Sequence, residues 1–182
     1  MKSDLDAAGC VAGWAVSARH IASPNCDERP EGVAISLLVI HNISLPSGQF
    51  GGPGVEQLFT NCLDPAEHPY YATIYTFRVS AHFFIRRDGD LIQFVPCTQR
   101  AWHAGTSSWR GRERCNDFSI GVELEGSDDQ PFTDAQYVRL NALVAVLRAA
   151  YPTLVDVAGH SDIAPGRKTD PGPYFDWQRV KG

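Results

Sequence analysis

The sequence predicts a single domain of the α/β (α+β) class, in which helices flank a mixed β-sheet. An unbroken apolar run at residues 36–42 has the length of a strand that is buried on both faces. An alternating segment at residues 79–85 is followed by the turn R-D-G-D and by a second apolar run at residues 91–95, which is typical of an antiparallel hairpin. A capping box at residues 133–136 precedes an apolar stripe and indicates a long helix. Strands of both kinds among helices favour a mixed sheet.

Size and composition are those of an ordinary globular protein. The chain has 182 residues, enough for one domain with a hydrophobic core, and it is 43% hydrophobic and 20% charged. A net charge of -5 argues against general affinity for nucleic acid or for an anionic membrane. The longest apolar runs are too short to span a bilayer. We therefore expect neither nucleic-acid nor membrane partners. A monomer is also expected, although these properties do not determine the oligomeric state.

The cysteines and the first ten residues predict a cytoplasmic location. There are five cysteines, an odd number, and no two of them form a C-x-x-C pair. The segment M-K-S-D-L-D-A-A-G-C carries two acids and no apolar stretch of the kind found in secretion signals. These features favour reduced thiols over a disulfide framework.

The remaining elements are expected from local patterns. Residues 1–35 are weakly patterned and should form an irregular segment packed on the domain, with a short helix or coil near residues 14–18. Later elements, in chain order, are a Gly- and Pro-rich loop at 45–54, a short helix at 55–63, an ordered loop at 64–75, a strand at 118–126, the long helix ending before Pro152, a strand at 154–158, a loop at 159–173 and a short helix at 174–180.

Two acidic residues lie on the otherwise apolar strand at residues 118–126. Its alternation places Ile120, Val122 and Leu124 on one face, and Glu123 shares the other face with Glu125. On an edge strand these carboxylates would simply be solvated. On an inner strand they would be unusual enough to suggest chemistry.

The loop at residues 159–173, G-H-S-D-I-A-P-G-R-K-T-D-P-G-P, concentrates reactive side chains. His160, Lys168 and Asp170 are separated by prolines and glycines, which restrict the backbone and can hold side chains in place. If its second half is extended, Lys168 and Asp170 point to the same side. A histidine and an aspartate on one rigid loop can form part of a metal site.

A third ligand is available at the end of the strand at residues 36–42. His41 lies at its carboxyl end, just before a loop, where sites are commonly built. A single histidine in such a place is often only a packed residue. In a mixed sheet, however, His41, Glu123 and the loop at His160 can all reach one edge.

Together these residues predict a zinc amidase or peptidase. His41, His160 and Asp170 form the ligand set of a catalytic zinc with an open fourth position for water. Glu123 is the candidate general base, which takes a proton from water and hands it to a leaving nitrogen. Lys168 would stabilise the oxyanion that forms at the attacked carbonyl.

Several longer phrases resemble one family. They are V-I-H-N-I-S-L-P at residues 39–46, F-G-G-P-G at 50–54, R-V-S-A-H at 78–82, A-W-H-A-G at 101–105, R-C-N-D-F-S-I-G-V-E-L-E-G at 114–126 and the closing R-K-T-D-P-G-P. The chain after residue 35 is similar to the AmpD-type amidases of the zinc amidase and peptidoglycan-recognition superfamily, whose fold is a mixed sheet flanked by helices. The resemblance implies one zinc ion held by His41, His160 and Asp170, with Glu123 as base and Lys168 as oxyanion partner.

The resemblance also implies a substrate and its contacts. The substrate would be an anhydro-muropeptide, cleaved between anhydro-N-acetylmuramic acid and L-alanine in cell-wall recycling. The implied contacts are Asn42 beside the metal, Trp102 by the sugar, and Arg78 and Arg114 for peptide carboxylates. From its residues alone, the segment with Arg114 favours a solvated basic loop over a carboxylate clamp. His103 beside Trp102 also fits a structural role. His82 is expected in the core.

Three other functions are compatible with parts of this pattern. A non-catalytic peptidoglycan-binding module usually lacks a zinc ligand or the catalytic pair, both of which are present here. A zinc peptidase or a secreted lytic amidase would act on other bonds or on intact wall. A purely structural zinc would need a fourth protein ligand, for which the sequence offers no evident residue.

Overall fold

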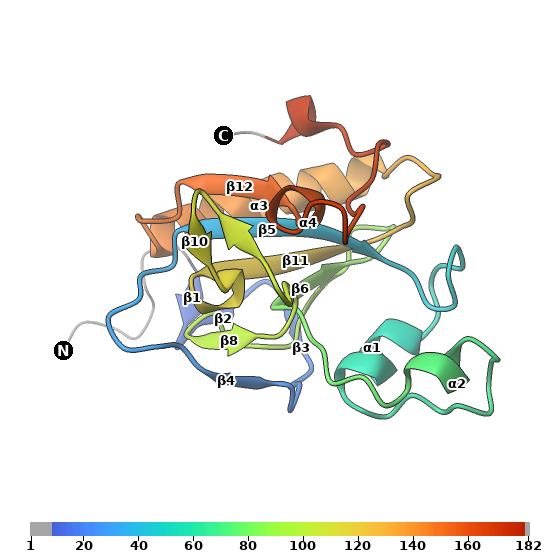
Figure 1. Ribbon diagram of the computed structural model, residues 1–182. Coiled ribbons are helices and arrows are strands. Elements are labelled where there is room, and N and C mark those ends of the chain that lie inside the picture. The colour runs from blue at the N-terminus through green and yellow to red at the C-terminus, as the bar shows by residue number, and fades with distance from the viewer. Residues whose placement is uncertain (1–8, 181–182) are drawn as a thin grey trace.

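A six-stranded mixed sheet forms the centre of the fold. The computed structural model describes residues 9–180 (Figure 1). The strand order is β12-β5-β11-β6-β7-β3, and β12, β5, β11 and β6 run parallel, whereas β7 is antiparallel to β6. The strands are β3 (Arg19–His20), β5 (Leu37–Ile43), β6 (Phe83–Ile85), β7 (Leu91–Gln93), β11 (Ser119–Glu125) and β12 (Asp156–Gly159). The expected mixed sheet and its hairpin are therefore confirmed.

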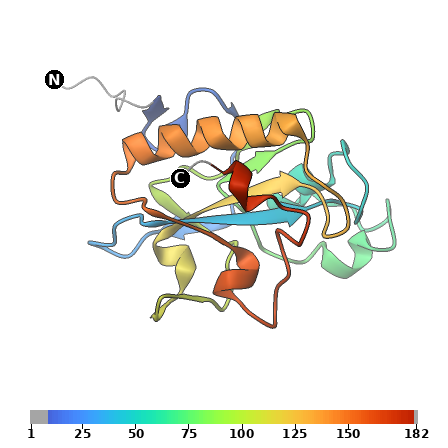
Figure 2. The same cartoon turned by 90° about the horizontal axis from the view of Figure 1, so that it is seen from above.

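The long helix α3 (Asp134–Ala150) covers one face of this sheet, as Figure 2 shows. Its buried stripe packs against alternate residues of the two central strands, among them Ile40 of β5 and Val122 of β11. Each fully buried aliphatic side chain contributes about 1.5–3 kcal/mol relative to an exposed one. The capping box is present, because Thr133 accepts from the Gln136 amide and the Gln136 side chain accepts from the Thr133 amide.

The intervening residues of the central strands face the opposite side of the sheet. Leu37 and Val39 of β5 pack there with Ala104 and with Ile163 of α4 (His160–Ile163). A further apolar cluster joins the hairpin to α1 (Gly54–Phe59) and α2 (Tyr71–Ile74). By alternation His41 and Glu123 belong to this second face. The candidate site and α3 therefore lie on opposite sides of the sheet.

The N-terminal part differs from its expected irregular form. Instead of a helix or coil near residues 14–18, β1 (Cys10–Val11) and β2 (Trp14–Ala15) form an antiparallel pair. Gln93, far along the chain, accepts from the Ala15 amide at 2.7 Å and donates to the Gly13 carbonyl at 2.8 Å. This tertiary partner, which no local pattern reveals, holds the segment extended. Residues 1–8 lie outside the described part.

Short elements complete the fold. Two of them fall where loops were expected: α2 within residues 64–75, and α4 directly after β12. The others are β4 (Cys26–Glu28) paired with β8 (Gln99–Ala101), the hairpin of β9 (Ser108–Trp109) and β10 (Arg112–Glu113), and the 3-10 helices η1 (Cys115–Asp117) and η2 (Trp177–Arg179). Within residues 9–180, none of the helices has the length and apolarity needed to cross a membrane.

Candidate metal centre and active site

The candidate site lies where three neighbouring parallel strands end. His41 is near the carboxyl end of β5, Glu123 pairs with it in register on β11, and His160 follows the last residue of β12. Parallel strands place their carboxyl ends at one edge of a sheet, where ligands commonly bind. The sequence expectation that these three residues reach the same edge is confirmed.

Two histidines and one carboxylate meet in a tight triangle. His41 Nδ1 lies 2.9 Å from His160 Nδ1, and each of these nitrogens lies 3.0 Å from Oδ2 of Asp170. The histidines are almost fully buried, at 1% and 4% exposure. An ion at the usual zinc distance of about 2.0–2.2 Å can reach all three atoms. The group therefore fits a divalent metal bound by two imidazoles and one carboxylate.

The surroundings favour the protonation states that bind metal. Burial lowers the pKa of His41 to about 4, so its imidazole is neutral at physiological pH. Burial opposes ionisation of Asp170, but hydrogen bonds with His160 and His41 outweigh it and hold the pKa of this carboxyl far below its ordinary value. A neutral imidazole and an ionised carboxylate are the forms that coordinate a metal.

Glu123 stands beside this triangle with an unused oxygen. The residue is only 8% exposed, and Oε2 has no hydrogen-bond partner among residues 9–180. Burial, together with the negative charge of Asp170, raises the pKa of Glu123 well above its ordinary value, whereas Lys168 acts in the opposite direction. A buried carboxylate without a partner is costly for folding, and such groups are typical of catalytic positions.

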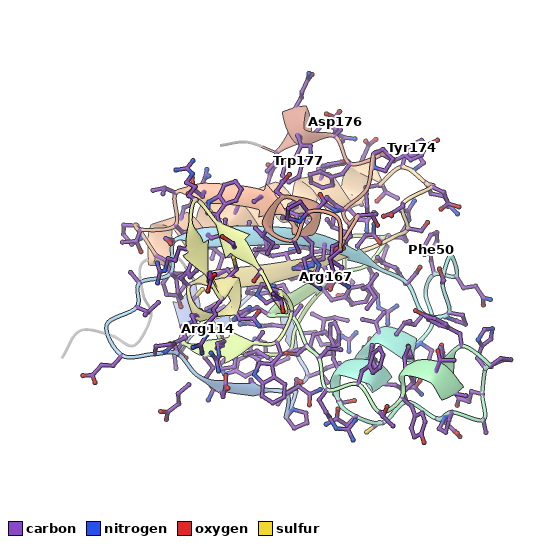
Figure 3. All side chains as sticks on the ribbon, in the orientation of Figure 1. Phe50, Arg114, Arg167, Tyr174, Asp176 and Trp177 are labelled. Carbon is purple, nitrogen blue, oxygen red and sulfur yellow. The ribbon has the colours of Figure 1, made fainter. Side chains whose placement is uncertain are left out.

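A cavity of about 690 Å³ connects these groups. Its lining includes all three members of the triangle together with Glu123, Lys168, Trp102 and Asn42. The loop carrying Lys168 is held by Arg167, which projects next to the segment at residues 104–106 (Figure 3) and donates to the carbonyls of Ala104 and Thr106 at 2.7 and 2.6 Å. Lys168 itself is exposed, so its ammonium group can reach a ligand.

Two of the predicted substrate contacts lie in this cavity. The Trp102 indole is oriented by a hydrogen bond from Nε1 to Asp27 at 3.2 Å. Asn42 uses its amide nitrogen to bind Oδ1 of Asp128 at 2.7 Å and the carbonyl of Pro171 at 3.0 Å. Only the amide oxygen of Asn42 is left for a ligand.

The other two predicted contacts lie outside this cavity, as far as its described lining extends. Arg78 is exposed, and its guanidinium lies against the carbonyls of Tyr75 and Phe77. Arg114 pairs with Asp117 and lines a neighbouring cavity of about 610 Å³, to which Arg167 also contributes. All four substrate contacts stay predictions.

Sequence reasoning did not assign the partners behind the candidate metal ligands. His103 Nδ1 lies 3.0 Å from His41 Nε2, and the Ala104 carbonyl lies 3.1 Å from His160 Nε2. Both residues belong to the phrase A-W-H-A-G, whose local pattern could not show which ring they face. His82, expected in the core, is fully buried, and its Nδ1 accepts from the Gly121 amide at 3.0 Å.

Comparison with known proteins decides the family. Residues 31–173 match the family described as N-acetylmuramoyl-L-alanine amidase. The chain belongs to this amidase family. It is 58% identical over 170 residues to the 1,6-anhydro-N-acetylmuramyl-L-alanine amidase AmpD of Salmonella typhimurium, covering 93% of this chain and 91% of the relative.

Solved structures agree with this assignment. A crystal structure of a selenomethionine AmpD derivative superposes with a TM-score of 0.91 at 57% identity, covering 93% of this chain and 95% of the other. The amidase AmiD of E. coli, solved with the substrate anhydro-N-acetylmuramic acid-L-Ala-D-gamma-Glu-L-Lys, has a TM-score of 0.60 at 32% identity. This match covers 84% of this amidase and 59% of AmiD. The family resemblance of the sequence phrases is confirmed.

Proposed function

We propose that this amidase is a zinc-dependent hydrolase of soluble muropeptides, cleaving the amide between 1,6-anhydro-N-acetylmuramic acid and L-alanine. The observation that carries the proposal is the metal-fitting triangle of His41, His160 and Asp170, with the partnerless oxygen of Glu123 in the same cavity. The substrate follows from relatives at 58% identity whose names specify the anhydro-muramyl-alanine bond.

In the proposed hydrolysis each residue of the site has a separate role. When bound, zinc supplies a Lewis acid that polarises the amide carbonyl and makes water more acidic. Glu123 accepts a proton from the water that attacks the carbonyl, and then delivers it to the nitrogen of the departing L-alanine. Lys168 places a positive charge near the oxygen that becomes negative during attack. The C–O bond to water forms, the C–N bond breaks, and the products are a lactyl carboxylate and a free amine.

The protein matrix prepares Glu123 for both proton transfers. Because burial raises its pKa, Glu123 holds a proton more strongly than a solvated glutamate. The positive charge of Lys168 lowers the pKa of Glu123, and a bound cation would lower it further. A carboxyl balanced in this way can act as base in the first half of the reaction and as acid in the second.

The substrate wall of the cavity is assigned by analogy and by chemistry. We place the sugar against Trp102, which belongs to the cavity lining and whose ring is held by a hydrogen bond to Asp27. Asn42 offers its amide oxygen to the peptide next to the scissile bond. Arg78 and Arg114 are proposed to bind stem-peptide carboxylates further out, since guanidinium groups bind carboxylates in bidentate fashion.

The decisive experiment is hydrolysis of soluble anhydro-muramyl tripeptide, followed by mass spectrometry, with and without a zinc chelator. Cleavage at the lactyl–alanine amide that stops with chelator and returns with zinc would support the proposal. No cleavage by protein that carries zinc would refute the substrate and favour a binding role. A parallel incubation with intact sacculi separates the recycling reaction from a lytic one.

The cellular context also remains a prediction. We propose that the amidase works as a monomer in the cytoplasm, in cell-wall recycling. Size-exclusion chromatography with light scattering tests the first point, and fractionation of cells that produce the full protein tests the second.

A further inference from the structure

The outward-facing nitrogens of both imidazole ligands are engaged by consecutive residues. His41 turns Nδ1 toward the metal position, and its Nε2 lies 3.0 Å from Nδ1 of His103. His160 likewise turns Nδ1 inward, and its Nε2 lies 3.1 Å from the carbonyl oxygen of Ala104. A ligand histidine must be unprotonated at the atom that faces the metal, so its proton lies on the other nitrogen. With a metal bound on the Nδ1 side, His41 therefore donates to His103, and His160 donates to Ala104.

This assignment also defines the state of His103. Because its Nδ1 accepts the hydrogen bond from His41, neutral His103 carries its own proton on Nε2. That nitrogen lies 3.2 Å from Oγ of Ser119, which can accept the hydrogen bond. The imidazole of His103 is thus fixed at both nitrogens, with a donor on one side and an acceptor on the other.

A single side chain holds the two residues together. Oδ1 of Asn116 accepts from the backbone N–H groups of His103 at 3.2 Å and of Ala104 at 2.8 Å. Asn116 belongs to η1, and the carbonyl oxygens of Asn116 and Asp117 both accept from the Arg29 guanidinium. The Asn116 oxygen is therefore anchored in the fold independently of the metal site.

Strand β11 leaves room for the His103 ring. A Cβ atom at Gly121 would lie only 2.5 Å from Cγ of His103, much closer than side-chain atoms approach. The imidazole therefore packs directly against the backbone of the strand that carries Glu123. Gly121 does not adopt a left-handed backbone conformation, so this close approach, and not φ, is the reason for a glycine here.

We propose that His103 and the Ala104 carbonyl, clamped by the side chain of Asn116, position both imidazole ligands of the metal centre. His103 acts through His41 and is a positioning residue. Outer partners of this kind fix ring orientation and tautomer, and their loss typically lowers metal affinity about 10- to 100-fold. The inference rests on the proposed zinc site, although it concerns residues that the proposed reaction does not use.

Two substitutions at one position separate acceptor from packing effects. The amide oxygen of an asparagine falls near the position of Nδ1, whereas the amide of a glutamine falls near Nε2. His103→Asn can therefore still accept from His41, while His103→Gln keeps only the contact with Ser119. We expect His103→Gln to raise the zinc dissociation constant about 10- to 100-fold, and His103→Asn to retain most of the affinity.

Two further pairs test the clamp and the packing. Asn116→Asp keeps an oxygen acceptor and should bind zinc more tightly than Asn116→Ala, which releases both backbone N–H groups. Gly121→Ala displaces His103, whereas Gly126→Ala meets the ring of Phe132 at the same 2.5 Å. Both glycine variants should lose stability, but only Gly121→Ala should lose zinc affinity beyond that.

The measurement is the zinc dissociation constant of the full chain, by chelator competition at fixed pH, with the Tm of each metal-free variant as a folding control. Equal zinc affinity for the Gln and Asn variants of His103, both folded, would overturn the inference while leaving the proposed function intact. Failure of the wild-type chain to bind zinc would instead refute the proposed function, and the inference with it. If Gly121→Ala does not fold, the His103 pair decides alone.

Discussion

Replacing Glu123 by glutamine should make the protein more stable and almost inactive. The glutamate is 8% exposed and its Oε2 has no hydrogen-bond partner in the described part of the chain, so its charge is buried with no hydrogen bond at this oxygen and is offset only by Lys168. An unsatisfied buried polar group usually costs about 1–3 kcal/mol, and more when it is charged, so exchanging the carboxylate for a neutral amide recovers part of this cost. For a chain of this size each kcal/mol changes Tm by roughly 2–4 °C. We therefore expect Glu123→Gln to raise the Tm of the metal-free protein by several degrees at neutral pH.

The pH dependence has a definite sign. Below the unfolded pKa of about 4.5 the carboxyl is protonated in both states and affects stability little. Burial raises the folded pKa, so stability falls as pH rises from about 4.5 toward that raised value, because only the unfolded state releases the proton easily. Glutamine does not titrate. The Tm advantage of Glu123→Gln should thus be larger at pH 8 than at pH 5.

Glu125, two residues further along the same strand, provides a matched control. It is 3% exposed, but its oxygens accept from the Gly51 amide at 2.6 Å and the Arg87 amide at 3.0 Å, and Oε1 also contacts Arg86. Glu125→Gln turns an amide donor toward one of these donors. This variant should lose about 1.5–3 kcal/mol of its free energy of unfolding, the usual contribution of a hydrogen bond to a charged group.

The assay combines thermal unfolding of both metal-free variants at pH 5 and 8 with hydrolysis by the zinc-loaded proteins. Because it removes the proposed general base, Glu123→Gln should lose about 10²–10⁴-fold in kcat/KM, or about 2.7–5.4 kcal/mol of transition-state stabilisation, while keeping its zinc. A Tm at or below wild type at pH 8 would refute the account of a poorly compensated buried charge. Unchanged turnover would refute the assigned base.

Three further predictions follow from the same site. His41→Ala and Asp170→Ala should lose zinc and activity together, as metal analysis of the purified proteins would show; one zinc per chain in either variant would contradict the ligand set. Lys168→Met should keep zinc but lose about 10²–10³-fold in kcat, the usual scale for one oxyanion partner, and a change confined to KM would speak against this role. His82, whose pKa is lowered to about 3 by burial and by Arg29, must stay neutral in the folded state, so the metal-free protein should lose stability as pH falls from about 6.5 toward 3, with a slope of about 1.4 kcal/mol per pH unit from this group. Free energies of unfolding measured by urea titration at several pH values should depend less steeply on pH for His82→Gln than for wild type.

Much of the framework was predictable because its determinants are local. The apolar run of β5, the alternation of β11 and the cap of α3 each express a preference of neighbouring residues, and all three are confirmed. The ligand types were also visible, since a histidine ends one strand while a second histidine and an aspartate follow another. The ligand atoms of these three residues form a triangle because the parallel strands end at one edge of the sheet. The mixture of strands and helices in the sequence suggested such a shared edge.

Tertiary structure alone decided what each of these side chains faces. His103 lies 62 residues from His41 in sequence, and Gln93 lies 78 residues from Ala15, so no periodicity connects either pair. The contrast between Glu123 and Glu125 arises in the same way. Both face the same side of one strand, but the loops that reach Glu125 with their N–H groups leave Oε2 of Glu123 without a hydrogen-bond partner in the described part of the chain. A sequence pattern determines which face a residue takes, because that depends on backbone periodicity. The register and the loops determine the atoms it meets there.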